Sequence, residues 1–537
     1  MVSRRRCNTP GRPRVGSGVA PTGRSAATGL ARIGFRLPRM NDLQDLLSGE
    51  PGRIAIASPD RDGITYAALA RQCTAIGRQL RGAGIGPDDR VAIVLPNGPA
   101  MASAFACMAP WCATAPLNPA YKTDEFDFYL KDLDASALVV DAQSTSPAVA
   151  VATALGVPVL RIAESVVAGE ITLDGVAEAE VASRPLDATA LILHTSGTTS
   201  RPKMVPLSQA NLIASAGNIA ATLRLEASDR CLNVMPLFHI HGLMAPVLAS
   251  LSVGAQVVCT PGFDALRFFS WLAEVKPTWY SAVPTMHQAI LARAGRNEAA
   301  VVGSALRFIR SSSASLPPQV MTALEETFGA PVIEAYAMTE AAHQMCSNPL
   351  PPEARKPGSV GPAAGPEVAI MDAQGGRLDG GEEGEIVIRG PNVTSGYLNN
   401  PAANAEAFRG DWFRTGDQGV MDEDGYVKVT GRLKEIINRG GEKVAPLEVD
   451  EVLLDHAAIQ QVCTFAVPHE KLGEEVAAAV VLADGADVSA RDLRRFAAER
   501  LADFKTPRRI VFVDEIPKGP TGKIQRIGLA HALGLSP

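Results

Sequence analysis

The chain has 537 residues, of which 46% are hydrophobic and 20% are charged, so it is long enough to bury the cores of several domains. Its net charge is −6, but residues 1–39 hold nine arginines and no acid, which leaves 42 basic against 57 acidic residues elsewhere. A body this acidic argues against a nucleic-acid partner. The longest apolar run, VAAAVVLA at 476–483, is far too short to span a bilayer, so no membrane partner is expected.

Residues 1–39 are rich in Arg, Gly and Pro and lack the apolar stretch that a secretory signal needs. An acid-free, Arg-rich start also resembles an organelle transit peptide. We favour a basic disordered arm, or a start placed too early with Met40 as the true one. The eight cysteines form no CxxC pair, which is typical of reduced thiols, and we expect a cytoplasmic protein.

Short apolar runs alternate with helical patterns from residue 53 to about residue 430. Buried strands are predicted at 90–96, 137–142, 158–163, 190–195 and 330–336. Helices are predicted at 65–84 and at 209–223, the second with Ser208 as its N-cap. Strands and helices that alternate in this way predict parallel α/β layers.

The pattern changes after about residue 384, where alternating residues and the Asp424-Gly425 turn predict antiparallel strands. Beyond Arg432 lies a compact α+β pattern, with strands at 462–467, 476–483 and 508–517 and a helix at 489–504. The expected fold class is α/β, with a large N-terminal domain of layered α/β subdomains plus a β-rich subdomain. A small α+β C-terminal domain follows it. The predicted boundaries are an arm at 1–39, a large domain at 40–432 and a small domain at 433–537.

The stretch HTSGTTSRPKMVPL, residues 194–207, gathers hydroxyl side chains around one glycine, just after a predicted strand. Small hydroxyl residues and glycine leave backbone N–H groups free, which suits the phosphates of a nucleotide. It is not a Walker loop, because Pro202 stands where that motif has a glycine before the lysine. The candidate phosphate-binding residues are Thr195, Ser196, Gly197, Thr198, Thr199 and Lys203.

Four further stretches have loop chemistry: EAYAMTE (334–340), WFRTGDQG (412–419), GRLKEIINRGGEKVAPLEVDEV (431–452) and PKGPTGKIQR (517–526). The second is expected to place Asp417 in a turn flanked by glycines. Together with the hydroxyl loop, and in this order, they resemble the AMP-forming adenylating superfamily over most of residues 45–530. That superfamily contains acyl-CoA synthetases, firefly luciferase and peptide-synthetase adenylation domains. One departure is PKMV at 202–205, where the family commonly has PKGV.

The resemblance implies a ligase that uses ATP, Mg²⁺ and CoA with a carboxylic acid. The acid attacks the α-phosphorus of ATP and expels pyrophosphate, and a thiol then attacks the acyl-adenylate and releases AMP. Both half-reactions build negative charge on oxygens, which needs cations and donors held in place. The catalytic residues that the resemblance implies are Lys523, Thr339 and Glu340.

Within that family, Glu340 would hold Mg²⁺ and Thr339 would donate to the α-phosphate. Lys523 would bridge the α-phosphate and the substrate carboxylate. Tyr336 would stack on adenine, Asp417 would accept from both ribose hydroxyls, and Arg432 would lie near the ribose and phosphate. The expected ATP pocket also includes Ser315, Glu334 and Ala335.

The family rotates its small domain between the two half-reactions, and Lys434 matches the hinge position. After rotation, the loop Gly440, Gly441 and Glu442 would replace Lys523 and help form the thiol tunnel, since glycines let backbone pass close to the pantetheine arm. For Arg439 and Lys443, a simple solvated charge is an equal alternative. Related enzymes are inactivated by acetylation at the position of Lys523, so an acetyltransferase and a deacetylase are candidate partners.

The acyl pocket is expected where imidazoles and hydroxyls gather, with His241, Ser313 and His343 as its candidate residues. A second carboxylate on a short acid needs such donors, because a buried unpaired charge is costly. With SNPLP, RKPGSVG and RGPNVT, these residues make the chain resemble the oxalate–CoA ligases of plants and fungi. The alternatives are a ligase for malonate or another short-chain or aromatic acid, a luciferase-like oxygenase, and a stand-alone adenylation module that loads a carrier protein. For His239 and His343, a loop-holding hydrogen bond is the structural alternative.

Overall fold

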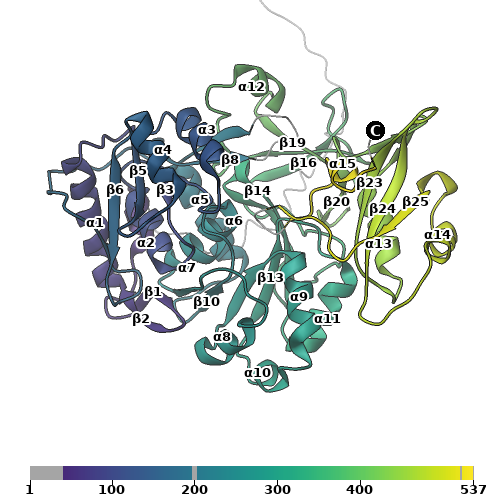
Figure 1. Ribbon diagram of the computed structural model, residues 1–537, viewed down its shortest axis with the longest axis horizontal. Coiled ribbons are helices and arrows are strands. Elements are labelled where there is room, and N and C mark those ends of the chain that lie inside the picture. The colour runs from purple at the N-terminus through teal and green to yellow at the C-terminus, as the bar shows by residue number, and fades with distance from the viewer. Residues whose placement is uncertain (1–39, 196–201, 520–522, 536–537) are drawn as a thin grey trace, which may run out of the picture. The chain divides into compact units, whose positions relative to one another are not determined.

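The structure is a computed structural model that describes residues 40–195, 202–519 and 523–535. Two large, mainly parallel sheets and two smaller sheets carry the fold (Figure 1), which confirms the predicted α/β class with layered subdomains and a β-rich part. Among the described residues, no helix is both long and apolar enough to cross a membrane.

The first large sheet has seven strands in the order β7-β6-β5-β3-β4-β8-β9, and all pairs are parallel except those of its edge strands β7 and β9. The strands predicted at 90–96, 137–142, 158–163 and 190–195 are confirmed as β3, β5, β6 and β8. The sheet contains β3 (Arg90–Val94), β4 (Ala113–Pro116), β5 (Ala137–Asp141), β6 (Val159–Glu164), β7 (Ile171–Leu173), β8 (Thr189–Thr195) and β9 (Lys203–Ser208). The helices of this part are α1 (Tyr66–Gly82), α2 (Pro99–Met108), α3 (Thr123–Leu133) and α4 (Pro147–Leu155).

The second large sheet has eight strands in the order β15-β14-β13-β12-β10-β11-β1-β2. Its strands are β1 (Ile54–Ser58), β2 (Arg61–Thr65), β10 (Arg230–Asn233), β11 (Gln256–Cys259), β12 (Trp279–Ala282), β13 (Phe308–Ser312), β14 (Val332–Met338) and β15 (His343–Ser347). Its helical elements are η1 (Leu43–Leu47), α5 (Gln209–Thr222), α6 (Ile240–Gly242), η2 (Leu243–Leu248), α7 (Ala249–Leu251), α8 (Phe268–Val275), α9 (Pro284–Ala294), α10 (Glu298–Val302), α11 (Pro318–Phe328) and η3 (Thr339–Ala341). As predicted, Ser208 caps α5, because its hydroxyl accepts from the backbone N–H of Asn211.

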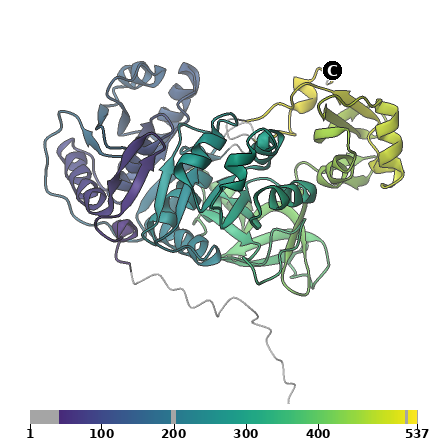
Figure 2. The same cartoon turned by 90° about the horizontal axis from the view of Figure 1, so that it is seen from below.

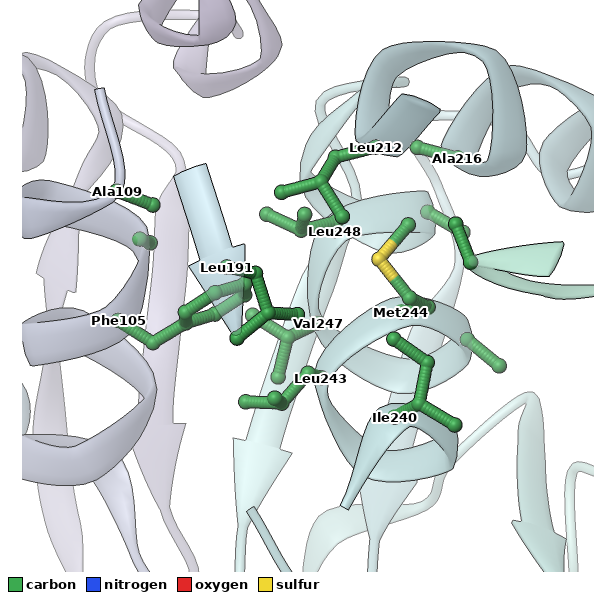
Figure 3. Close-up of a cluster of buried hydrophobic side chains, with 14 of the residues drawn as sticks. Phe105, Ala109, Leu191, Leu212, Ala216, Ile240, Leu243, Met244, Val247 and Leu248 are labelled. Carbon is green, nitrogen blue, oxygen red and sulfur yellow. The ribbon is translucent and has the colours of Figure 1, made fainter. Parts of the chain in front are cut away.

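One apolar core lies between the two large sheets, and Figure 3 shows its centre around the π-helix η2. Leu191 of β8 and Phe105 of α2 reach toward η2 from the first sheet, while Leu212 reaches toward it from α5. Pro246 lies within η2 and has no N–H to donate, which favours a wider turn there. This packing fixes the short helix α6 that precedes η2, and with it His241.

The β-rich part is an antiparallel sheet made of β16 (Glu367–Met371), β17 (Gly384–Arg389), β18 (Phe408–Arg409), β19 (Trp412–Met421) and β20 (Val427–Arg432), with α12 (Pro401–Ala407) beside it. The C-terminal sheet contains β21 (Ile437–Arg439), β22 (Glu442–Val444), β23 (Ile459–His469), β24 (Gly473–Leu482) and β25 (Arg509–Phe512). Its helical elements are α13 (Pro446–Leu454), α14 (Ala490–Ala498), η4 (Asp503–Lys505) and α15 (Leu529–Ala532). Figure 2 shows these C-terminal elements, in yellow-green, gathered around their own sheet.

Two local predictions are wrong. Asp417 does not lie in a turn but inside strand β19, where it faces Arg432 of β20 across the antiparallel pair. The helix expected at 489–504 ends at Ala498, and a short 3₁₀ turn replaces its last part. The helical path is already broken at Ala502, whose ψ of 147° is not helical, and Pro507 then keeps Thr506 extended after the 3₁₀ turn.

Candidate active site

A cavity of about 320 Å³ lies where the end of β14 meets the β19–β20 pair and the C-terminal segment. Eight of the residues predicted from the motifs line it: Ser313, Ser315, Glu334, Ala335, Tyr336, Asp417, Arg432 and Lys523. They come from segments that are far apart in the chain. The fold therefore brings most of the predicted nucleotide site to one place.

Asp417 is the centre of a hydrogen-bonded group in this cavity. Arg432 Nε donates to Asp417 Oδ1 over 3.0 Å, and the Tyr336 hydroxyl donates to Oδ2. Burial and the neighbouring Asp417 carboxylate raise the pKa of Tyr336 well above its usual value, so this phenol stays a donor. A carboxylate oxygen can accept more than one hydrogen bond, so Asp417 retains acceptor capacity for hydroxyls of a ligand.

Lys523 is half-buried and enters the same cavity from the C-terminal segment. Desolvation, followed by repulsion from the Arg432 guanidinium, lowers the pKa of Lys523 to about 8, although Asp417 and Glu340 oppose the shift. An ammonium with this pKa is still mostly charged at pH 7 and lies close to three other charged side chains. It can therefore follow negative charge that moves between two bound groups.

Glu334 lines the cavity and is 2% exposed. Its Oε1 accepts from the backbone N–H of Leu316 over 2.8 Å, while Oε2 has no partner among the described residues. Burial raises the pKa of Glu334 to about 8, so the side chain carries a proton at neutral pH. Its O–H is then a donor inside the cavity.

The predicted phosphate loop is only partly covered by the structure. Thr195 and Lys203 are register partners at the ends of β8 and β9, and the loop joins these two strands. Lys203 Nζ lies 4.4 Å from the ring centroid of Tyr397, a cation–π contact that holds the ammonium. Ser196, Gly197, Thr198 and Thr199 lie outside the described residues.

The predicted metal ligand Glu340 follows β14 directly, in the short turn η3 that also carries Thr339. Its Oε1 accepts from the Tyr397 hydroxyl over 2.9 Å, and burial raises the pKa of Glu340 above the usual range. The described residues contain no group of three His, Cys, Asp or Glu side chains that could hold a metal ion. One oriented carboxylate nonetheless fits Mg²⁺, which proteins often bind with one or two carboxylates plus substrate phosphates and water.

The three predicted acyl residues form one cluster. His241 Nδ1 lies 3.0 Å from Ser313 Oγ, and the rings of His241 and His343 stack with centroids 4.8 Å apart. Burial lowers the pKa of both imidazoles far below the usual value, so both are neutral. Only Ser313 lines the cavity; the two histidines lie behind it and are fully buried.

Ser313 and His343 have backbone conformations that L-residues rarely adopt. Their φ angles are +76° and +100°, and Ala342 before His343 has a φ of +47°. Each such conformation costs on the order of 1–3 kcal/mol, and strain of this kind gathers at functional sites. The strain supports a functional role for this cluster over a purely structural one.

A buried arginine lies behind the two histidines. Arg310, in the middle of β13, is fully buried, and its Nη1 lies 3.1 Å from His343 Nε2 and 3.4 Å from His241 Nε2. Desolvation lowers the pKa of Arg310 to about 9, so the guanidinium is still charged at pH 7. The sequence motifs gave no reason to single out Arg310, although a charge inside the stretch RFIRSS of a buried strand is unusual.

The predicted hinge and tunnel residues lie elsewhere. Lys434 is exposed between β20 and β21, and Gly440 and Gly441 form the turn of the β21–β22 hairpin, where Glu442 begins β22. None of these residues is among those that line the nucleotide cavity. Arg439 Nε pairs with Glu475 over 2.5 Å, and both side chains are largely buried, so Arg439 is ion-paired and is not the simple solvated charge of the alternative.

Histidine and tyrosine contacts that the motifs did not reveal complete the site. His239 Nδ1 accepts from the backbone N–H of His241, and desolvation lowers the pKa of His239 to about 3. This contact supports the loop-holding alternative for His239. Tyr397, the partner of both Glu340 and Lys203, lies four residues after RGPNV and was not among the predicted residues; only its place beside a conspicuous motif could have suggested it.

Comparisons with known proteins agree with this geometry. The AMP-binding enzyme family matches residues 43–398, and the AMP-binding enzyme C-terminal domain matches residues 448–523. The oxalate–CoA ligase of Arabidopsis thaliana is 45% identical over 496 residues, 90% of this chain and 96% of the relative. The oxalate–CoA ligase of Saccharomyces cerevisiae is 42% identical over 451 residues, 79% of this chain and 82% of the relative. The crystal structure of ATP-bound MatB from Rhodopseudomonas palustris superposes with a TM-score of 0.84 at 29% identity, covering 92% of this chain and 99% of that one.

Proposed function

Since the chain belongs to the AMP-binding enzyme family, as its five motifs predicted, we propose that it is an ATP-dependent ligase that joins oxalate to CoA. The products would be oxalyl-CoA, AMP and pyrophosphate, formed through an acyl-adenylate. The family membership confirms an enzyme of the adenylating class. The names of the relatives from Arabidopsis thaliana and Saccharomyces cerevisiae support oxalate as the acid.

The proposal of oxalate as the acid rests on one observation: polar side chains form and support the wall of the cavity that contains Lys523. Ser313 lines the cavity, His241 lies 3.0 Å behind it, and His343 stacks on His241. A long aliphatic acid would leave these groups desolvated and unpaired, which is costly. A second carboxylate at short distance from the first would accept from them instead.

The residues of the cavity would divide the adenylation step between them. Asp417, held by Arg432 and Tyr336, would accept from the ribose hydroxyls, and Tyr336 would stack on adenine beside Ser315, Glu334 and Ala335. Lys523 would hold the acid carboxylate against the α-phosphorus, with Thr339 donating to the α-phosphate. Most of these roles use side chains that already line one cavity in the structure.

The phosphate end of the site would be formed by Lys203, the hydroxyl loop and Glu340. Mg²⁺ bound by Glu340 would neutralise charge on the phosphate oxygens as pyrophosphate leaves. Tyr397 would keep both groups in place, because its hydroxyl donates to Glu340 and its ring lies under Lys203.

The thioester step would use another arrangement of a small domain, residues 433–537, against a large domain, residues 40–432. Lys434 would be the hinge, and the Gly440–Glu442 turn would replace Lys523 beside the acyl-adenylate. The exposure of that turn in the present arrangement supports this proposal, since an exposed hairpin turn can approach a second position without unpacking a core.

Lys523 would also be the point of regulation. Acetylation by a lysine acetyltransferase removes the charge of the ammonium and so would stop adenylation, and a deacetylase would restore it. The seven cysteines among the described residues are all free and buried, which supports a reducing compartment such as the cytoplasm.

A coupled assay with one panel of acids tests the proposal. Purified protein is incubated with ATP, Mg²⁺ and CoA and with oxalate, malonate, acetate or coumarate, and AMP, pyrophosphate and the thioester are measured. Oxalate should give the highest kcat/KM. A higher kcat/KM for malonate or coumarate would make that acid the proposed substrate in place of oxalate. Adenylation without any CoA turnover would favour a carrier-loading module. Oxygen uptake or emission of light would favour an oxygenase.

A further inference from the structure

Arg310 is a buried positive charge for which the described part of the chain provides no negative partner. Its side chain is fully buried in β13, yet no carboxylate among the described residues lies within ion-pair distance of it. Arg526 shows the usual solution: its guanidinium pairs with Asp450 over 2.6 Å and with Glu435 over 3.3 Å. An unpaired buried charge is costly, so Arg310 is expected to serve a purpose beyond packing.

The side-chain partners of the Arg310 guanidinium in the described ranges are all neutral. Nη1 faces His343 Nε2, His241 Nε2 and Ser281 Oγ, and Nη2 donates to Gln344 Oε1 over 3.3 Å. Arg310 Nε has no partner among the described residues. Within this part of the chain, the guanidinium is therefore neither neutralised nor fully satisfied.

These contacts decide which nitrogen of each imidazole carries the proton. A guanidinium only donates, so His343 Nε2, 3.1 Å from Nη1, must accept, and the proton of this neutral ring lies on Nδ1. His241 Nε2 faces two donors, the Ser281 hydroxyl at 2.6 Å and Arg310 at 3.4 Å, so its proton also lies on Nδ1. Arg310 thus orients both rings in the same way.

The two Nδ1–H groups lie on the other side of the rings from the nitrogens that face Arg310. There His241 meets Ser313, whose hydroxyl accepts from Nδ1 and is left with its own proton to donate into the cavity that it lines. The His343 ring stacks on the ring of His241 at an interplanar angle of 26°, and its Nδ1 is buried without a partner among the described residues. Ser313 therefore presents a hydroxyl donor to the cavity, and the His343 Nδ1–H lies behind it as a second donor without an acceptor among the described residues.

We propose that Arg310 is a positioning residue that selects acids with a second carboxylate: it holds His241 and His343 as Nδ1–H donors, and the second carboxylate balances its buried charge. This inference rests on the proposed function and names the group that gives that site its substrate class. A monocarboxylic acid of the same size brings no charge to balance Arg310 and loses this advantage.

Oxamate tests the charge without changing the shape, since it is oxalate with one carboxylate replaced by a neutral amide. The full chain, Arg310→Met, Arg310→Lys and Arg184→Met are compared by ATP–pyrophosphate exchange, with oxalate as substrate and oxamate as substrate or competitor. Arg184 is the matched control, because it is also a buried arginine without a carboxylate partner among the described residues, but it donates to the backbone carbonyls of Ala109 and Thr189, away from the imidazoles and the cavity.

The wild-type chain should favour oxalate over oxamate by about 30-fold or more, which is the range of one charge-assisted contact. Arg310→Met should remove most of this preference by raising the KM for oxalate, with the KM for ATP changed less than about twofold. Arg310→Lys should retain part of the preference, and Arg184→Met should retain all of it. Equal loss of oxalate and oxamate in Arg310→Met, or an unchanged oxalate KM, would overturn the proposal.

A measurement on the wild-type chain keeps the test decisive if Arg310→Met does not fold. ¹⁵N NMR of histidine-labelled protein, assigned through His241→Gln and His343→Gln, should place the proton of both rings on Nδ1; a proton on His343 Nε2 would overturn the proposal. A different result would contradict the proposed function: a wild-type chain that adenylates no oxalate. The comparison is then made with the acid that the panel identifies and its monoamide, and an acid with a single carboxylate would overturn the Arg310 proposal as well.

Discussion

Arg432 Nε donates to Asp417 Oδ1 over 3.0 Å, and the two residues face each other as register partners of β20 and β19. The strand pair thus fixes a carboxylate in the cavity without using all of its acceptor capacity. A turn, as the sequence suggested, would have left this carboxylate free to move. The strand position makes it a rigid acceptor for the hydroxyls of a bound nucleotide.

Asp417→Asn should therefore weaken nucleotide binding. Replacing a charged acceptor removes about 1.5–3 kcal/mol per hydrogen bond, so the KM for ATP should rise by about 10- to 100-fold, with a smaller change in the KM for the acid. Steady-state kinetics with ATP varied would measure it. Asp411→Asn is the control, because Asp411 is an exposed residue just before β19 that pairs with Arg389 at the surface. An unchanged KM for ATP in Asp417→Asn would remove this residue from the ribose site.

Lys523 should impose an upper pH limit on adenylation. Its pKa is lowered to about 8, so the ammonium is present below that pH and is lost as the pH rises through it; ATP–pyrophosphate exchange should fall in the same range. Lys523→Arg should shift this fall to higher pH, because a guanidinium stays charged. Lys523→Ala should abolish exchange yet largely spare thioester formation from supplied acyl-adenylate.

Lys518 of the same segment is the control for Lys523, since it pairs with Glu515 at the surface and Lys518→Ala should leave both half-reactions unchanged. Equal loss of the two half-reactions in Lys523→Ala would contradict the two-arrangement proposal.

Tyr397→Phe should raise the Mg²⁺ concentration needed for half-maximal activity by about 10- to 100-fold, the effect of one hydrogen bond to a charged group. The hydrogen bond from Tyr397 favours the ionised form of Glu340, so its removal raises the Glu340 pKa further, and the defect should be larger at pH 6 than at pH 8. Mg²⁺ titrations at the two pH values would show this. Tyr426→Phe is the matched control, because the Tyr426 hydroxyl donates to the Ala354 carbonyl at the surface. A pH-independent effect would count against the Glu340 assignment.

Glu334 should make the protein less stable as the pH rises. Its folded-state pKa of about 8 lies above the ordinary value of 4.5, so between these values the folded state holds a proton that the unfolded chain has lost. The free energy of unfolding should fall with pH across this window, by up to about 1.4 kcal/mol per pH unit. Glu334→Gln keeps the acceptor for Leu316 and should flatten this slope, while Glu423→Gln at an exposed position should not. Urea unfolding between pH 5 and pH 8 measures it, and identical slopes in wild type and Glu334→Gln would refute the assignment.

Gly441→Trp should block the thioester step and spare adenylation. Gly441 has a φ of +100°, and the space where a Cβ would stand is open among the described residues, so bulk is accommodated in the present arrangement and interferes only where the turn would approach the acyl-adenylate. Gly441→Ala carries the same backbone strain with little bulk and serves as the control. Thioester formation from supplied acyl-adenylate should be lost in the tryptophan variant alone; normal CoA turnover there would remove the turn from the tunnel.

Sequence patterns determined several of the elements, because the periodicity of apolar residues and the capping residues act locally. For this reason, the sequence alone predicted strands β3, β5, β6 and β8 from their buried apolar runs, and it predicted Ser208 as the N-cap of α5. The ordered motifs likewise indicated the family and many of the side chains that line the cavity. The end of the helix at Ala498 and the strand position of Asp417 were missed, since the break at Ala502 and the pairing of β19 with β20 override the local pattern there.

By itself, then, the sequence determined the class of chemistry, since loops that bind phosphate and nucleotide are contiguous stretches with recognisable composition. Tertiary structure alone decided which side chains face one another: Tyr397 against Glu340, Glu334 against the N–H of Leu316, and Arg310 behind His241 and His343. Such pairs come from separate elements, and their protonation follows from desolvation and neighbouring charges. Neither the desolvation of these groups nor their neighbouring charges can be taken from the order of residues in the chain. The buried charge behind the acyl site is therefore identified only from the assembled sheet.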